Sequence, residues 1–257
     1  MVSSNRRFLI KYLTVALLVA LCIPLDSMDV FNAALLNPGR VDVHYFWMNS
    51  VIYGGIYGCY FIYVLAAVPF AGFFCREYQW GSWRYLIARE GTKRYVKRRF
   101  RKAFLYGGTV TAVGGVLFLA FTLQFCPLFL ETRYIEVSFL PYSIYLRDTP
   151  WVYYLIVHYL LFLSGGFWSC IACTFSVYVP IRYLVCLVPY IFNFFLIRLG
   201  VILKIPAEWR LDFWMCGRAA PTGTLWDLVW LTAVLVVILW VCRRLFYRKL
   251  KWRIANE

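Results

Sequence analysis

The sequence predicts an all-α integral membrane protein that forms a single transmembrane domain over residues 1–257. Of its 257 residues, 63% are hydrophobic, and the mean hydropathy is +0.67; soluble domains are usually about 45–50% apolar. Apolar runs long enough to cross a bilayer recur along the chain, and the basic residues gather in a few of the segments between them. These observations predict six transmembrane helices and leave little of the chain for a separate soluble domain.

Each expected span is an apolar run close to the length of about 17–25 residues that a bilayer requires. The six runs cover residues 8–25, 48–74, 103–125, 151–177, 180–203 and 225–242. The first contains Lys11 and precedes no small-residue cleavage site, so we interpret it as a retained span. The fifth carries Pro189 and Arg198 and is, with the first, the least regular. A tight turn between the fourth and fifth predicts a hairpin, and the segments 126–150 and 205–224 leave room for short helices.

The charges predict how these spans are oriented. Twenty of the 27 Lys and Arg residues lie near the N-terminus, in the segment 76–102, at the turn near Arg182 and after the last span. Nine of the 12 acidic residues lie in the other loops. Because basic loops remain in the cytoplasm, we expect both termini to be cytoplasmic, in a multi-pass protein of the cell membrane, specifically a bacterial plasma membrane. Topology thus accounts for the net charge of +15, and nucleic-acid binding is not expected.

The segment 75–102 between the second and third spans predicts a cytoplasmic docking surface. If residues 77–89 form one amphipathic helix, Glu77, Gly81, Arg84 and Ala88 share one stripe at 3.6 residues per turn. Trp80 lies on the adjacent stripe with Trp83 and Ile87. Such a helix can lay its Trp face on the membrane and offer the other stripe to a protein groove. The basic cluster 93–102 is typical of a segment that contacts anionic lipid head groups.

The order Arg76-Glu77-Tyr-x-x-Gly81-Ser82-x-Arg84-x-Leu86-Ile-x-Arg89 resembles the cytoplasmic loop of ABC exporter permeases of the type-two family. In that family an E-x-x-x-G-[TS] helix follows the second span and couples the permease to its ATPase. The fourth and fifth spans, with Gly165 and Pro189, are similar to the family pattern as well. Trp83 departs from it, since smaller or aliphatic residues are common there.

This resemblance implies a membrane subunit that couples a separate cytoplasmic ATPase to the export of an amphipathic substrate, such as a peptide antibiotic, a toxin or a lipid-like compound. It implies contacts of Glu77 and Arg84 in the ATPase groove, and a second permease protomer, identical or related. The implied coupling residues are Glu77, Trp80, Gly81, Ser82, Trp83, Arg84, Ala88 and Arg89. No G-x-x-x-x-G-K-[ST] sequence occurs, so we expect no enzyme activity in this chain and assign ATP and Mg²⁺ to the partner ATPase.

Other candidate sites are less specific. Four tyrosines of the second span and one histidine of the fourth could line a substrate path, or serve only helix packing: Tyr53, Tyr57, Tyr60, Tyr63 and His158. The pattern Gly54-x-x-x-Gly58 is typical of close helix packing, within the bundle or between protomers.

A disulfide between Cys126 and Cys216 is an option in an oxidising compartment, and no His or carboxylate cluster predicts a metal site. Alternative functions are a transporter or channel that needs no ATPase, or a membrane assembly factor.

Overall fold

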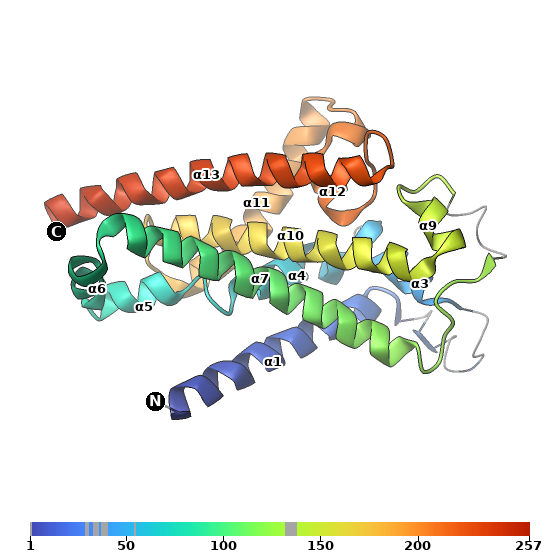
Figure 1. Ribbon diagram of the computed structural model, residues 1–257, viewed down its shortest axis with the longest axis horizontal. Coiled ribbons are helices and arrows are strands. Elements are labelled where there is room, and N and C mark those ends of the chain that lie inside the picture. Colours follow the sequence, from blue (N-terminus) through green and yellow to red (C-terminus); the bar gives the residue numbers. More distant parts are fainter. Residues whose placement is uncertain (1, 29–30, 33–35, 37–40, 54, 132–137) are drawn as a thin grey trace.

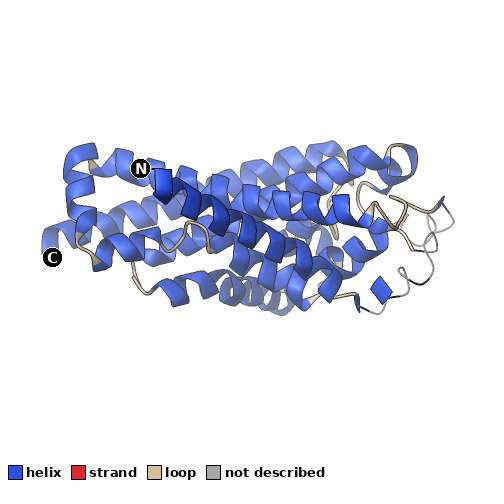
Figure 2. Cartoon of the chain, turned by 90° about the horizontal axis from the view of Figure 1, so that it is seen from below, coloured by secondary structure: helices blue, strands red, loops and turns tan. Residues whose placement is uncertain are grey.

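The computed structural model describes residues 2–28, 31, 32, 36, 41–53, 55–131 and 138–257, and the side chains from residue 9 onward within them. Its described residues form helices and connecting loops without strands, and the long helices run side by side along the longest axis (Figures 1 and 2). The five longest are α1 (Val2–Leu25), α7 (Thr92–Thr122), α10 (Pro150–Ser176), α11 (Arg182–Ile202) and α13 (Leu225–Asn256). An all-α chain is therefore confirmed.

Four of these helices, α7, α10, α11 and α13, are long and apolar enough to cross a membrane. The apolar part of α1 is shorter, Leu9–Leu25. The second expected span is bent by 66° between Val43–Ile52 and Tyr57–Ala67, and counts as a fifth crossing if the two parts form one span. The apolar helices thus show the character of a membrane protein, while six spans remain a prediction.

The bent span consists of short helical pieces of different pitch. Its first part is α3 (Val43–Trp47) continued by the π-helix η1 (Met48–Ile52), and its second part is the π-helix η2 (Tyr57–Phe61) continued by α4 (Ile62–Ala67). The carboxylate of Asp26, just after α1, accepts hydrogen bonds from the backbone N–H groups of Tyr57 at 3.1 Å and Gly58 at 2.7 Å. Asp26 therefore satisfies the backbone donors that the bend exposes at the start of the second part.

Glycines explain how closely the helices approach. A Cβ atom at Gly107 of α7 would lie 2.7 Å from the carbonyl oxygen of Gly165 of α10, and the Thr111 hydroxyl donates to the Leu161 carbonyl across the same interface at 2.9 Å. A side chain at Gly58 would clash with Ser50, so this glycine serves helix packing within the chain. Gly54 lies outside the described residues. The glycine pairs of α7 and α10 thus serve packing within this bundle.

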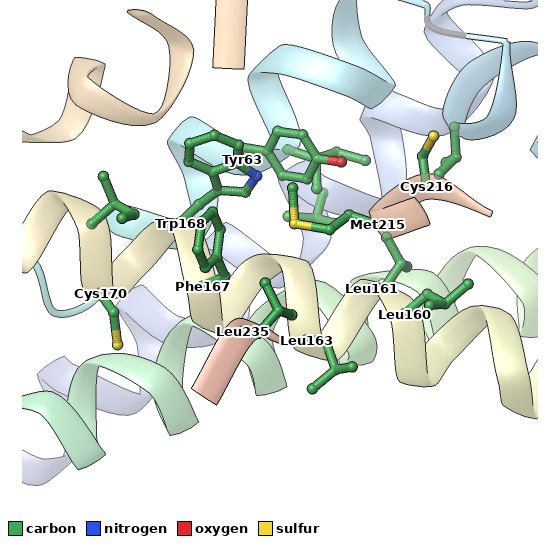
Figure 3. Packing of buried hydrophobic residues seen from close by; sticks show 14 of the residues in the cluster. Tyr63, Leu160, Leu161, Leu163, Phe167, Trp168, Cys170, Met215, Cys216 and Leu235 are labelled. Atoms are coloured by element: carbon green, nitrogen blue, oxygen red, sulfur yellow. The ribbon is translucent and has the colours of Figure 1, made fainter. Parts of the chain in front are cut away.

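The helix α10 lies at the centre of the core. Most of its apolar stretch is buried, whereas α11 and α13 leave most of theirs exposed. Tyr63 of α4 lies against Trp168 of α10 with ring centroids 5.5 Å apart, and Met215 enters the same cluster from another helix (Figure 3). The bundle therefore buries most of one helix and presents apolar surface outward, as expected in a lipid environment.

Short helices close the two ends of the bundle. They are α5 (Phe73–Gln79), α6 (Ser82–Glu90), α9 (Ser143–Asp148), the 3₁₀ turn η4 (Ala207–Trp209) and α12 (Leu211–Cys216). The last three confirm short helices in the segments 126–150 and 205–224. Both chain ends lie at the same end of the bundle as α5 and α6 (Figure 1), as the charge distribution predicts.

Candidate functional site

The predicted single helix over residues 77–89 is wrong, because the chain turns between α5 and α6. Trp80 ends the first helix, and Gly81 adopts a left-handed conformation with φ of +68° before the second begins at Ser82. A residue with a side chain is strained in that conformation, which glycine adopts freely. Glu77 and Arg84 therefore lie on two different helices and do not share a stripe. We call residues 73–90, with both helices and the turn, the elbow.

Glu77 faces the bundle. Its carboxylate forms an ion pair with Arg99 of α7 and accepts a hydrogen bond from the Tyr95 hydroxyl at 2.6 Å. The side chains of Glu77 and Arg99 are only 14% and 8% exposed. The implied contact of Glu77 with an ATPase groove is therefore corrected: Glu77 fastens α5 to α7, and its charge is already matched within the chain.

The two tryptophans of the elbow are separated as well. Trp83 is 2% exposed and its ring stacks on Tyr78 with centroids 6.1 Å apart, beside Phe74. Trp80 is 77% exposed. The two tryptophans therefore do not share one face. Trp83 holds α6 against the bundle, and its large side chain, which departs from the family pattern, fills the space beside Tyr78 and Phe74. Trp80 points outward with Tyr85, which is also exposed.

A groove of about 850 Å³ opens on the outer side of the elbow. Its lining includes five of the expected coupling residues, which are Trp80, Gly81, Trp83, Arg84 and Ala88. Of the other three, Ser82 donates to the Glu77 carbonyl at 3.4 Å, Arg89 is exposed outside the groove, and Glu77 faces inward. The structure therefore gathers most of the implied residues on one surface, but by folding the segment around a turn.

The end of α13 completes the groove and ties it to the bundle. Tyr78 donates to the Glu257 carboxylate at 3.0 Å, and Arg84 donates to the Glu257 main-chain carbonyl. Arg253, one turn earlier, stacks on the Tyr78 ring and donates through Nε to the Val177 carbonyl at the end of α10 at 2.8 Å. The elbow is thus linked to α7, α10 and α13 through two buried arginines.

Sequence reasoning missed the role of Arg253. It counted this residue only as one of six basic residues after the last span. The one signal available was its position in a helical register with Cys242, Phe246 and Leu250, which are all buried on the inner face of α13. An arginine on that apolar stripe indicates a buried partner.

Three of the four tyrosines expected along a substrate path lie together, and the path itself stays a prediction. Tyr53, Tyr60 and Tyr63 line a small cavity of about 170 Å³ at the opposite half of the bundle, whereas Tyr57 does not. Polar side chains from α11 and the 205–224 segment share this cavity: Asn193, Asp212 and Arg218. His158 lies elsewhere, with Nδ1 2.6 Å from the Tyr154 carbonyl oxygen and its ring against Trp47.

Cys126 and Cys216 are free thiols, so the structure does not contain the disulfide that the sequence allowed. Cys216 is buried and its thiol lies 3.3 Å from the Phe213 carbonyl oxygen. Burial, reinforced by the Asp42 carboxylate, raises the pKa of the Cys126 thiol, which keeps it protonated and unreactive at neutral pH. Among the described residues, no group of three or more His, Cys, Asp or Glu side chains could hold a metal ion.

Comparisons with protein-family models, curated proteins and solved structures find no significant match to this chain.

Proposed function

We propose that this chain is the membrane subunit of an ATP-driven exporter and that the elbow receives a separate cytoplasmic ATPase. The observation that carries the proposal is the groove at the end of the bundle, where exposed Trp80 and Arg84 lie on a turn that is bonded to three long helices. An amphipathic surface of this kind suits a partner groove. Its links inward give a bound partner a mechanical route to the spans.

In this mechanism the ATPase holds ATP and Mg²⁺ and contacts Trp80, Arg84, Ala88 and Arg89, all exposed. Closure of the ATPase displaces the elbow as a rigid unit, because Trp83 of α6 stacks on Tyr78 of α5 within it. The displacement passes to α7 through Arg99, and to α10 and α13 through Arg253. Helix shifts of this kind change access to a substrate pathway, here for an amphipathic molecule and between two permease protomers in a bacterial plasma membrane.

Co-purification of an ATPase tests the proposal. The tagged chain, extracted from its native membrane, is expected to retain a P-loop ATPase, and the variant Trp80→Ala/Arg84→Glu is expected to lose it. The matched control is Trp252→Ala/Lys249→Glu, which changes an aromatic and a basic residue at the same end of the bundle but outside the groove. Retention of the ATPase by the groove variant, or equal loss from the control, would contradict the proposal.

A second candidate is a transporter that works without an ATPase, and the bent span favours it. Discontinuous membrane helices with exposed backbone N–H groups often bind substrates or ions in such transporters. Here the Asp26 carboxylate already binds the N–H groups of Tyr57 and Gly58, so an ionisable side chain at the break, and not a set of open N–H groups, is what favours this candidate. Substrate uptake driven by an ion gradient into proteoliposomes that contain the chain alone would support this candidate over the exporter. Uptake only with the ATPase and ATP would support the exporter.

A further inference from the structure

A second cavity lies between α13 and the start of α7, away from the elbow groove. Five of its lining residues come from one face of α13 at helical spacing: Trp240, Arg243, Arg244, Tyr247 and Arg248. Lys93 and the buried side chain of Val96 close it from α7. Its volume is about 400 Å³, which is within the range of small-molecule sites, about 300–1,000 Å³.

The two helices are held together on the neighbouring face of α13. Phe246 is fully buried and packs edge-on against Phe100 of α7, with ring centroids 5.7 Å apart. This contact fixes the spacing between Lys93 and the arginines of α13, which lie on either side of the cavity. The cavity is therefore a feature of packed helices and does not depend on a loop.

The lining carries four positive charges and no carboxylate. The ion pairs found among the described residues involve Arg98, Arg99, Arg210 and Arg253, none of which lines this cavity. The nearest acidic residue in sequence, Glu90, pairs with Arg98. Arg244 stacks on the Trp240 ring at 4.0 Å. Four cations gathered without a counter-charge create a local positive potential that attracts an anion.

The position of the cavity along α13 indicates where that anion comes from. No charged residue lies between Asp227 and Arg243, a helical distance of about 24 Å at 1.5 Å per residue. That is close to the thickness of the hydrocarbon core, about 30 Å, so Arg243 and Arg244 begin at the level of lipid head groups. Exposed Val236 and Val237 continue from Trp240 along α13 toward the membrane centre, and offer apolar surface to acyl chains.

We propose that this cavity binds the head group of one anionic phospholipid from the cytoplasmic leaflet. The arginine guanidinium groups donate to the phosphate oxygens in their forked geometry, and Val96, Trp240 and Tyr247 contact the glycerol region. Arginine side chains select the phosphate, and the exposed valines select a lipid over a soluble phosphate. The inference does not depend on the exporter, because neither the elbow groove nor an ATPase contributes to this cavity.

Native mass spectrometry of the purified full chain tests the proposal, with phosphatidylglycerol and phosphatidylcholine as probes. We expect one phosphatidylglycerol to remain bound per chain and phosphatidylcholine to be lost. Because a charge-assisted hydrogen bond to a phosphate contributes roughly a factor of ten or more in affinity, Arg243→Gln/Arg248→Gln should weaken phosphatidylglycerol binding by more than about tenfold. The matched control Arg101→Gln/Lys249→Gln removes two charges from the same two helices outside the cavity. It should weaken binding much less, because charges that do not touch the phosphate act only through attraction that salt screens.

Three outcomes would overturn the proposal. Equal weakening by both double variants would show a diffuse electrostatic attraction without a site. Equal retention of phosphatidylcholine would show that the charges do not select the lipid. Displacement of bound phosphatidylglycerol by inorganic phosphate or glycerol phosphate at the same concentration would show that the site takes a soluble phosphate. Unchanged α-helical circular dichroism and gel-filtration profiles of both variants confirm that each is folded.

Discussion

Replacement of Glu77 is the sharpest test of how the elbow is held. In Glu77→Leu the side-chain volume is similar, but Arg99, only 8% exposed, loses its counter-charge, and the Tyr95 hydroxyl loses its acceptor. Leaving one partner of a buried ion pair without the other costs about 3–5 kcal/mol. The Tyr95 bond belongs to the same network and is not added as a separate contribution. We therefore expect a loss of about 3–5 kcal/mol in the free energy of unfolding.

The control is Glu257→Leu at the same end of the bundle. Glu257 also forms an ion pair, with Arg253, but its side chain is 28% exposed, and Arg253 keeps its main-chain acceptors on the α10–α11 turn. Because Glu257 is partly exposed and Arg253 keeps its carbonyl acceptors, we expect this replacement to cost less than that of Glu77, about 1 kcal/mol. Unfolding of each variant in detergent micelles, followed by tryptophan fluorescence as denaturant is added, measures the difference.

The double variant Glu77→Leu/Arg99→Met tests whether Glu77 acts as the partner of a buried ion pair or as a docking residue. Apolar replacement of both partners removes the unpaired charge, so we expect most of the lost stability to return. ATPase binding should return with it if Glu77 acts only by positioning the elbow. A Glu77→Leu variant as stable as Glu257→Leu, or a double variant no more stable than the single one, would refute the reasoning.

The structure makes three other predictions. Gly107→Leu should prevent α7 from approaching α10 and lower the yield of folded protein in gel filtration, whereas Val116→Leu on the exposed face of α7 should not. Arg253→Gln should remove the hydrogen bond to the Val177 carbonyl at the end of α10 and weaken the contact between α13 and Tyr78 of the elbow. Amide hydrogen exchange in the elbow should therefore increase, and unchanged exchange would contradict the proposed link between α13 and the elbow. Alkylation of unfolded, unreduced protein should modify both Cys126 and Cys216, and a mass lacking these two adducts would indicate a disulfide.

The sequence predicted those features that depend on local composition. Apolar runs located the long helices, because a bilayer requires a minimum length of apolar residues. The lysine and arginine distribution predicted two cytoplasmic termini; both chain ends lie at one end of the bundle (Figure 1), and the side of the membrane on which they lie stays a prediction. The hairpin of α10 and α11 followed from the few residues between two apolar runs, and the structure places only a short turn there.

Features that depend on three-dimensional contacts were not predictable in the same way. A helical projection placed Glu77 on an outer stripe because it assumed one continuous helix, and the left-handed conformation of Gly81 invalidates that assumption. The bend in the second span depends on Asp26, more than 30 residues away from Tyr57 and Gly58. The composition of the span shows that it is apolar. It does not show which distant carboxylate accepts the hydrogen bonds of the N–H groups at the bend.

The elbow combines two properties that a coupling element needs, and different residues provide them. Its outer surface, with Trp80 and Arg84, is open to a partner. Its inner surface, with Glu77 and Trp83, is buried and bonded. A buried ion pair adds little net stability over an apolar contact, yet it fixes one register between α5 and α7 because Arg99 has no other carboxylate partner among the described residues. In the proposed exporter, Glu77 would therefore transmit force to α7, and partner recognition would belong to the residues beyond the turn.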